Sequence, residues 1–262
     1  MNHRRDLRDP SIFTPENLLR EARRQKSIPK RQVPRVCLLD PDGDIVRYLI
    51  RKGRATVNPN WACDHTKMFY HQLGNTTVGI VGNAVGSPFA VLVAEEMFAS
   101  GYTLLLSLTS AGRISERPDL PRFLVILKAL RDEGTSDHYV ARGSSCLPNS
   151  ILLKTLSSAL GNSRLSLGPG TSWTTDAPFR ETAAAIRRAQ KLGADCVEME
   201  AAALYAFAQA RRKDVICVAH VTNSMARSIG DFEKGEEGGS IDSLTLIDFL
   251  LQTLRQAGYR DR

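Results

Sequence analysis

The chain has 262 residues, of which 42% are hydrophobic and 24% charged, and this composition is typical of a soluble globular protein. No apolar run approaches the ~20 residues of a membrane-spanning helix and no apolar core of signal-peptide type follows the N-terminus, so we expect a cytosolic protein without a membrane partner. Six of the seven net positive charges belong to residues 1–35, on an arm rather than interleaved with aromatic residues on a folded face, so nucleic-acid binding is not expected.

A helix is predicted within the basic arm of residues 1–34. Thr14 is a good N-cap, and Pro15 suits the first helical position. The apolar side chains that follow form a narrow stripe: Leu18, Leu19 and Ala22. We therefore expect this helix to dock on the main domain or on a neighbouring subunit.

Beyond the arm, residues 35–262 alternate short apolar strands with helices. The predicted strands cover residues 36–39, 77–81, 102–108, 123–127, 164–167 and 215–221. The predicted helices cover residues 89–98, 150–160, 180–192 and 241–254. Apolar strands that alternate with helices favour a largely parallel central sheet covered on both faces. We predict a single α/β domain.

The cysteines, histidines and glycines indicate no disulfide, metal or nucleotide-cofactor site. The five cysteines are widely scattered without a Cys-x-x-Cys pair, and the five histidines show no metal-ligand spacing. The loop from Gly82 to Gly86 matches neither the dinucleotide-binding pattern nor the P-loop. We expect no metal and no organic cofactor.

Two carboxylates, Glu198 and Glu200, flank Met199 where a short apolar strand meets an alanine-rich helix. Acids beside a buried apolar segment are costly unless something binds them, so they suggest a ligand. A carboxylate can accept two hydrogen bonds from vicinal hydroxyls, which is a means of binding a sugar. The alternative is an acidic first turn that complements the helix dipole.

Several segments, taken in order, resemble the nucleoside phosphorylase superfamily, the group of purine nucleoside and uridine phosphorylases and related nucleosidases. The similar segments are residues 81–88, 91–97, 109–112, 131–139, 170–178, 197–202 and 221–223. The resemblance implies a twisted, mixed and mostly parallel sheet flanked by helices. It also implies a homo-oligomer, either a trimer or a hexamer, with a dimer as the alternative.

The resemblance assigns roles to individual residues. Glu200 matches the carboxylate that binds the ribose hydroxyls, Met199 would pack on the sugar, and Glu198 would lie beside base and sugar. Trp173 falls where an aromatic ring often stacks on the base, with a core aromatic as the alternative. The substrate-binding set is completed by two residues of the similar segments: Val85 and Ser172.

Asn223 stands where purine-cleaving members often carry an aspartate that protonates the leaving base. An asparagine cannot titrate, but its amide both donates to and accepts from a base edge. This favours recognition of a 6-oxopurine or a pyrimidine by hydrogen bonds. The alternative is an ordinary turn residue.

The nucleophile is the part of the site where the chain departs from the phosphorylases. Ser107 stands in place of one phosphate-binding arginine, and the loop ending at Arg47 lacks the other, although Ser110 is retained and Arg47 could restore positive charge. Asp44 could instead position an attacking water, with a turn aspartate as its alternative. Family membership slightly favours a pentosyltransferase that uses inorganic phosphate and releases free base and ribose 1-phosphate. The alternatives are a hydrolytic nucleosidase and a non-catalytic nucleoside-binding protein.

Overall fold

A ten-stranded mixed sheet forms the centre of the computed structural model, which describes residues 7, 9–160, 165–225 and 231–259. Its strands are β1 (Val36–Asp40), β2 (Thr56–Val57), β3 (Met68–Leu73), β4 (Thr76–Gly82), β5 (Leu104–Arg113), β6 (Phe123–Asp132), β7 (Ser145–Cys146), β8 (Leu167–Thr175), β9 (Cys196–Glu198) and β10 (Asp214–Asn223). The α-helices are α1 (Pro15–Lys26), α2 (Asp44–Arg51), α3 (Ser87–Ser100), α4 (Ser150–Ala159), α5 (Ala183–Lys191), α6 (Ala201–Arg211) and α7 (Ser240–Gln256). Within the described residues, none of these helices combines the length and the apolarity needed to cross a membrane.

Strand β5 organises the sheet because it pairs with three other strands. It runs parallel to β1 and to β10 and antiparallel to β9. Parallel pairs then connect β9 to β8 and β8 to β6, and an antiparallel pair returns from β6 to β10. Five strands therefore close into a circuit, and β1, β4, β3 and β2 extend from β5 as an open wing.

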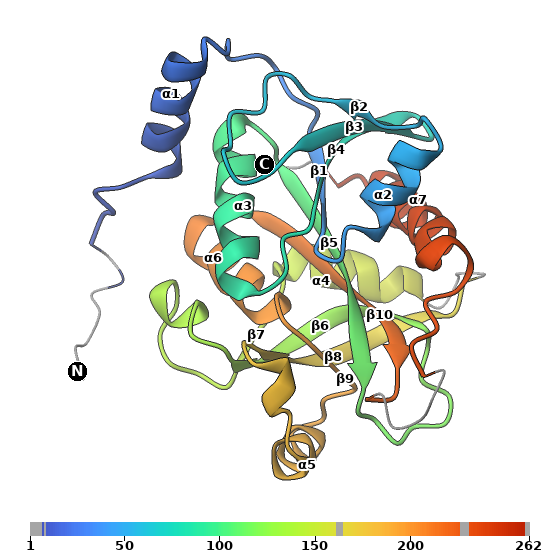
Figure 1. Ribbon diagram of the computed structural model, residues 1–262. Helices are drawn as coiled ribbons and strands as arrows, with labels where there is room; N and C mark the ends of the chain where they lie inside the picture. Colours follow the sequence, from blue (N-terminus) through green and yellow to red (C-terminus); the bar gives the residue numbers. More distant parts are fainter. Residues whose placement is uncertain (1–6, 8, 161–164, 226–230, 260–262) are drawn as a thin grey trace.

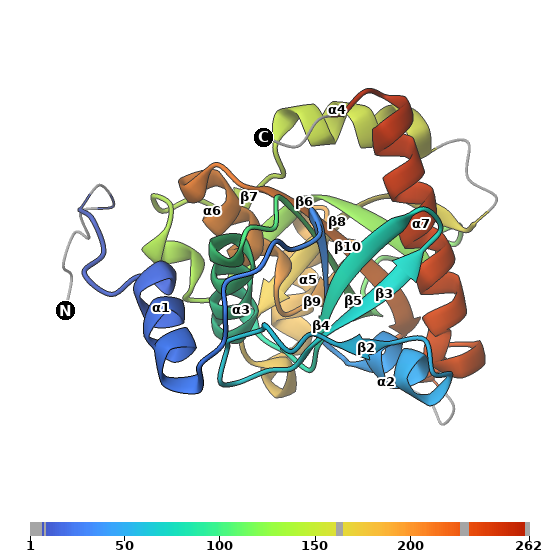
Figure 2. The same cartoon turned by 90° about the horizontal axis from the view of Figure 1, so that it is seen from above.

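Helices cover the sheet on both faces, as Figures 1 and 2 show. Along β5, Leu105 contributes to one apolar core and Leu106 to the other, because side chains of a strand alternate between its faces. The first core lies under α3 and α6, and the second lies under α2, α4 and α7. The predicted mixed α/β fold is confirmed.

Helix α1 docks on the body of its own chain. The side chain of Thr14 accepts a hydrogen bond from Asn17 N (3.3 Å) and caps the helix as predicted. Leu19 and Ala22 are buried against Ala62 and the half-buried Ala99 of α3. Figure 1 shows α1 beside α3.

Several elements differ from their predicted extents. Strands β5 and β6 continue five residues past the predicted ends at 108 and 127, because strands on both sides supply hydrogen-bond partners. The strand predicted over 164–167 instead begins at Leu167 and runs to Thr175, and residues 161–164 lie outside the described part. Helix α5 begins only at Ala183, after the N-cap Thr182. The prediction missed α2 and β3.

Tyr205 of α6 ties two strands of the circuit together. Its hydroxyl donates to Ile126 O of β6 (2.6 Å) and accepts from Cys217 N of β10 (3.0 Å). We expect Tyr205→Phe to lower the free energy of unfolding by about 2 kcal/mol in urea denaturation, because a buried N–H and a buried carbonyl both lose their partner. The matched variant is Tyr139→Phe. The Tyr139 hydroxyl donates to Glu95 in a half-buried position (2.7 Å), so its removal should lower the free energy of unfolding by less. Equal losses would contradict this role for Tyr205.

Candidate active site

Glu200 is a buried carboxylate with one oxygen that the protein leaves unpaired. It precedes the first turn of α6 and is 1% exposed. Its Oε1 accepts a hydrogen bond from Gly86 N (2.7 Å), whereas Oε2 is buried and has no hydrogen-bond partner among the described residues. Because an unpaired buried oxygen is costly, a donor from a ligand would be strongly favoured there.

The surroundings of Glu200 disfavour its charged form in the free protein. Burial raises its pKa to about 8, and the negative charges of Glu198 and Asp42 add to this effect. The backbone N–H of Gly86 and the hydroxyl of Thr109 act in the opposite direction. Hydroxyl groups that donate to Oε2 would add to these donors and return the carboxylate to its anionic form.

Glu198 has a different role from its neighbour, because the protein itself uses both of its oxygens. Oε1 accepts from Thr174 Oγ1 (2.5 Å), and Oε2 accepts from the backbone N–H of Glu200 and of Ala201 (2.7 Å each). Glu198 therefore caps the start of α6 and fixes the backbone that carries Glu200. Ser172 is fully buried and helps to lower the pKa of Glu198, which burial raises.

The starts of helices α3 and α6 meet at Glu200. Ser87, the first residue of α3, donates through Oγ to Met199 O (2.7 Å), next to the bond between Gly86 N and Glu200. Met199 is half-buried, and Val85 is 50% exposed beside this junction. Val85 and Met199 thus lie next to the residues that hold Glu200, and their predicted contact with a substrate stays a prediction.

A charged loop follows β1 and lies against the end of β5. Asp42 Oδ2 accepts from Ser110 N (2.9 Å). Asp44 forms an ion pair with Arg47, whose guanidinium also donates to Asn83 Oδ1 (3.3 Å) in the loop that leads to Gly86. Asp44, Arg47 and Ser110 are therefore brought together at one edge of the sheet.

Lys234, which follows β10 in the chain, adds a second cation to the charged group formed by Asp42, Asp44 and Arg47. It was not predicted from the sequence. Its Nζ lies 2.5 Å from Asp44 Oδ2 and 3.3 Å from Asp42 Oδ2. Partial burial lowers the pKa of Lys234, but the hydrogen bond to Asp44 and the charge of Asp42 outweigh this and raise it overall. The only local signal is a glycine-rich segment after Lys234, where Gly235, Gly238 and Gly239 have positive φ.

Trp173 and Ser107 lie inside the protein rather than at an open site. Trp173 is 4% exposed among apolar residues that include Ile114 and Val197, and its Nε1 donates to Asp132 Oδ2 (2.9 Å). The indole is therefore a core aromatic, because its neighbours cover the faces that a base would need. Ser107 is 1% exposed in the interior of β5, between β1 and β10.

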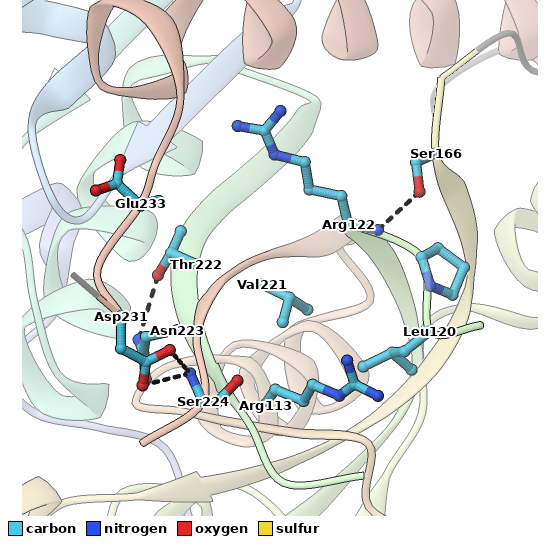
Figure 3. A pocket seen from close by; sticks show the side chains of 11 residues that line it. Arg113, Leu120, Arg122, Ser166, Val221, Thr222, Asn223, Ser224, Asp231 and Glu233 are labelled. Carbon is cyan, nitrogen blue, oxygen red and sulfur yellow. Dashed lines mark hydrogen bonds between the residues drawn. The ribbon is translucent and has the colours of Figure 1, made fainter. Parts of the chain in front are cut away.

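Asn223 lines a polar cavity of about 340 Å³ beyond the end of β10 (Figure 3). Its Oδ1 accepts from Met225 N (2.9 Å) and its Nδ2 donates to Thr222 Oγ1 (3.3 Å), so the amide stabilises the local turn. In Figure 3, Asn223 lies beside Asp231, and Arg122 lies across the cavity from them. Glu200 is not among the residues that line this cavity.

Comparison with known proteins identifies the family. A sequence profile described as the phosphorylase superfamily matches residues 35–246. The fold is similar to that of uridine phosphorylase from Vibrio fischeri solved with 6-hydroxy-1-naphthoic acid (TM-score 0.70, 20% identity, covering 86% of this chain and 93% of that one). It is also similar to the 5'-methylthioadenosine/S-adenosyl homocysteine nucleosidase of Campylobacter jejuni (TM-score 0.67, 15% identity, covering 86% and 100%). This chain belongs to the phosphorylase superfamily.

Proposed function

We propose that this protein is an enzyme that cleaves the N-glycosidic bond of a nucleoside. The observation that carries the proposal is Glu200, a buried carboxylate that is held on one side by Gly86 N and whose second oxygen has no hydrogen-bond partner among the described residues. Two vicinal ribose hydroxyls are suitable donors, because a carboxylate accepts both in one plane. The half-buried Met199 is next to Glu200 in the chain, and we propose that it contacts the sugar.

The bound carboxylate would assist bond cleavage as well as binding. Breaking the glycosidic bond develops positive charge on the ribosyl ring, and a fixed anion beneath the ring stabilises that charge more than it stabilises the ground state. Because Glu200 is anchored by a backbone N–H and surrounded by protein, little reorganisation is needed when the charge develops.

Water is the nucleophile that we propose. Asp42 and Asp44 lie at the end of β5 with both nearby cations, Arg47 and Lys234, already paired to them. In the reaction, a water oxygen bonds to C1′ while the electron pair of the glycosidic bond leaves on the base nitrogen. The proton released by water balances the proton that the base takes up, and the products are free base and ribose. Asp44 is the proposed group that orients the water.

Phosphorolysis is the second candidate, and two observations favour it. The chain belongs to the phosphorylase superfamily, and the Arg47 side chain is 55% exposed, so its guanidinium can still turn to an anion. The products would then be free base and ribose 1-phosphate.

A single assay tests the proposed function. We expect base release from at least one member of a panel of purine and pyrimidine nucleosides in phosphate-free buffer, with free ribose as the sugar product. Base release that requires inorganic phosphate and yields ribose 1-phosphate would select phosphorolysis instead. Saturable nucleoside binding without any base release would show a binding protein and overturn the proposed enzyme activity.

A further inference from the structure

We propose that Asp42 acts as an internal anion that occupies the backbone N–H of Ser110, and that Lys234 is the positioning residue that holds it there. The pair would exclude inorganic phosphate and so select water as the nucleophile. This inference deepens the proposed function and rests on it for the identity of the reaction. The occupancy of the Ser110 N–H is a separate claim, which can be tested without any nucleoside.

The backbone N–H of Ser110 is a hydrogen-bond donor that Asp42 already occupies. Strand β1 pairs with β5 only as far as Ser107, so it does not use the backbone N–H of Ser110, which is a donor suited to an anion. That N–H is already taken by Asp42 Oδ2 at 2.9 Å. A phosphate bound here would have to displace the Asp42 carboxylate.

The charged side chains around Ser110 are paired with one another. Two aspartates and two cations form the group, and each cation already contacts an aspartate: Arg47 pairs with Asp44, and Lys234 pairs with Asp42 and Asp44. Phosphate binding in proteins depends on charge-assisted hydrogen bonds from cations that are free to donate. Here the internal carboxylates occupy Lys234 and one side of the Arg47 guanidinium, so an incoming phosphate would compete with them.

The segment that carries Lys234 is anchored to the domain on both sides. The carbonyl of Lys234 accepts from Arg122 Nη2 (2.7 Å), and the preceding residue, Glu233, donates its N–H to Thr222 O (3.2 Å). Three residues after Lys234, in the 3-10 helix η4 (Glu236–Gly239), Glu237 forms ion pairs with Arg51, the last residue of α2, and with Lys52, which follows it. The main chain on both sides of Lys234 is thus fixed to the domain, and the ammonium group is held over Asp42.

The test is calorimetric titration of inorganic phosphate into folded protein, with circular dichroism as the check of folding. Asp42→Ala frees the Ser110 N–H and removes one of the two carboxylates that pair with Lys234, so we expect phosphate to bind at least ~10-fold more tightly than to the wild type. Asp42→Asn retains an oxygen that can accept from Ser110 N and should show less than a ~3-fold gain. Adding Lys234→Met to Asp42→Ala should remove the gain.

A matched variant separates the charge of Lys234 from the anchoring of its segment. Adding Lys52→Met to Asp42→Ala removes an exposed lysine that pairs with Glu237 and should leave the gain in phosphate binding intact. In the nucleoside assay, Asp42→Ala with phosphate should yield ribose 1-phosphate where the wild type yields ribose. Folded Asp42→Ala with no gain in phosphate affinity would overturn this inference even if the wild type hydrolyses nucleosides. A gain in affinity without any nucleoside cleavage would instead overturn the proposed function alone.

Discussion

Glu200→Gln is expected to lower kcat for nucleoside cleavage by at least ~100-fold while the protein stays folded. The amide oxygen of glutamine can still accept from Gly86 N, so the junction of the two helices is preserved. The negative charge is lost, however, and with it the stabilisation of the ribosyl cation. One of the two acceptors for the ribose hydroxyls is also replaced by a donor. Steady-state kinetics on the best nucleoside of the panel measures the effect.

The same substitution should change how stability depends on pH. In the ligand-free protein the pKa of Glu200 is about 8, whereas its ordinary value is 4.5, so between these values only the unfolded chain gives up the proton. The free energy of unfolding therefore falls as pH rises through this window, by up to about 1.4 kcal/mol per unit from this group. Asp40, whose pKa burial raises to about 7, adds a slope of the same sign in both proteins.

Urea denaturation of wild type and Glu200→Gln at a series of pH values measures the contribution of Glu200 together with its interaction with Glu198, because groups that do not interact with Glu200 cancel in the difference. We expect the variant to gain stability relative to wild type as pH rises from about 5 to about 8. The control is Glu16→Gln, an exposed acid of α1, which should show no such trend. An active Glu200→Gln enzyme would refute the role of this residue in the reaction.

Glu198→Ala is expected to lower the free energy of unfolding by about 3–5 kcal/mol. We attribute this effect to lost hydrogen bonds within the protein and not to a lost contact with a ligand. The substitution leaves the backbone N–H groups of Glu200 and Ala201 and the hydroxyl of Thr174 without their acceptor in a buried place. Helix α6 also loses its cap, and the backbone that carries Glu200 is released. Loss of activity should therefore follow loss of the fold.

Two further variants separate capping from substrate contact. Glu198→Gln retains one oxygen acceptor and should cost less than the alanine variant, and Thr174→Val removes one donor and should cost about 1–2 kcal/mol. The free energy of unfolding and the KM are measured together. A Glu198→Ala protein of wild-type stability with a raised KM would show instead that this side chain contacts the substrate.

The sequence predicts the fold well where apolar side chains decide the structure. Strands such as β1 (Val36–Asp40) and β4 (Thr76–Gly82) are nearly continuous apolar runs, and burial on both faces requires that pattern. Helix α2 was missed because its eight residues mix charged and apolar types over only two turns. Strand β3 was missed because its pattern becomes clear only beside its partner β4.

The site is predicted less completely because neighbours in the chain can face different surroundings. Glu198 and Glu200 are two residues apart, yet one is saturated by the protein and the other keeps a free oxygen. Trp173 is buried because of packing under α5, which no local pattern reports. Lys234 reaches Asp44 across 190 positions of the chain, so only the path of the folded chain brings them together.

The bond between Gly86 N and Glu200 joins residues 114 positions apart and therefore orders events during synthesis. A nascent chain that has emerged only as far as α5 contains the loop at Gly86 but lacks the carboxylate that this loop holds. Nucleoside can then bind only after the C-terminal half has been made and docked. Bound nucleoside would favour the completed fold over its precursors by mass action, so substrate supply would set the steady-state amount of folded protein.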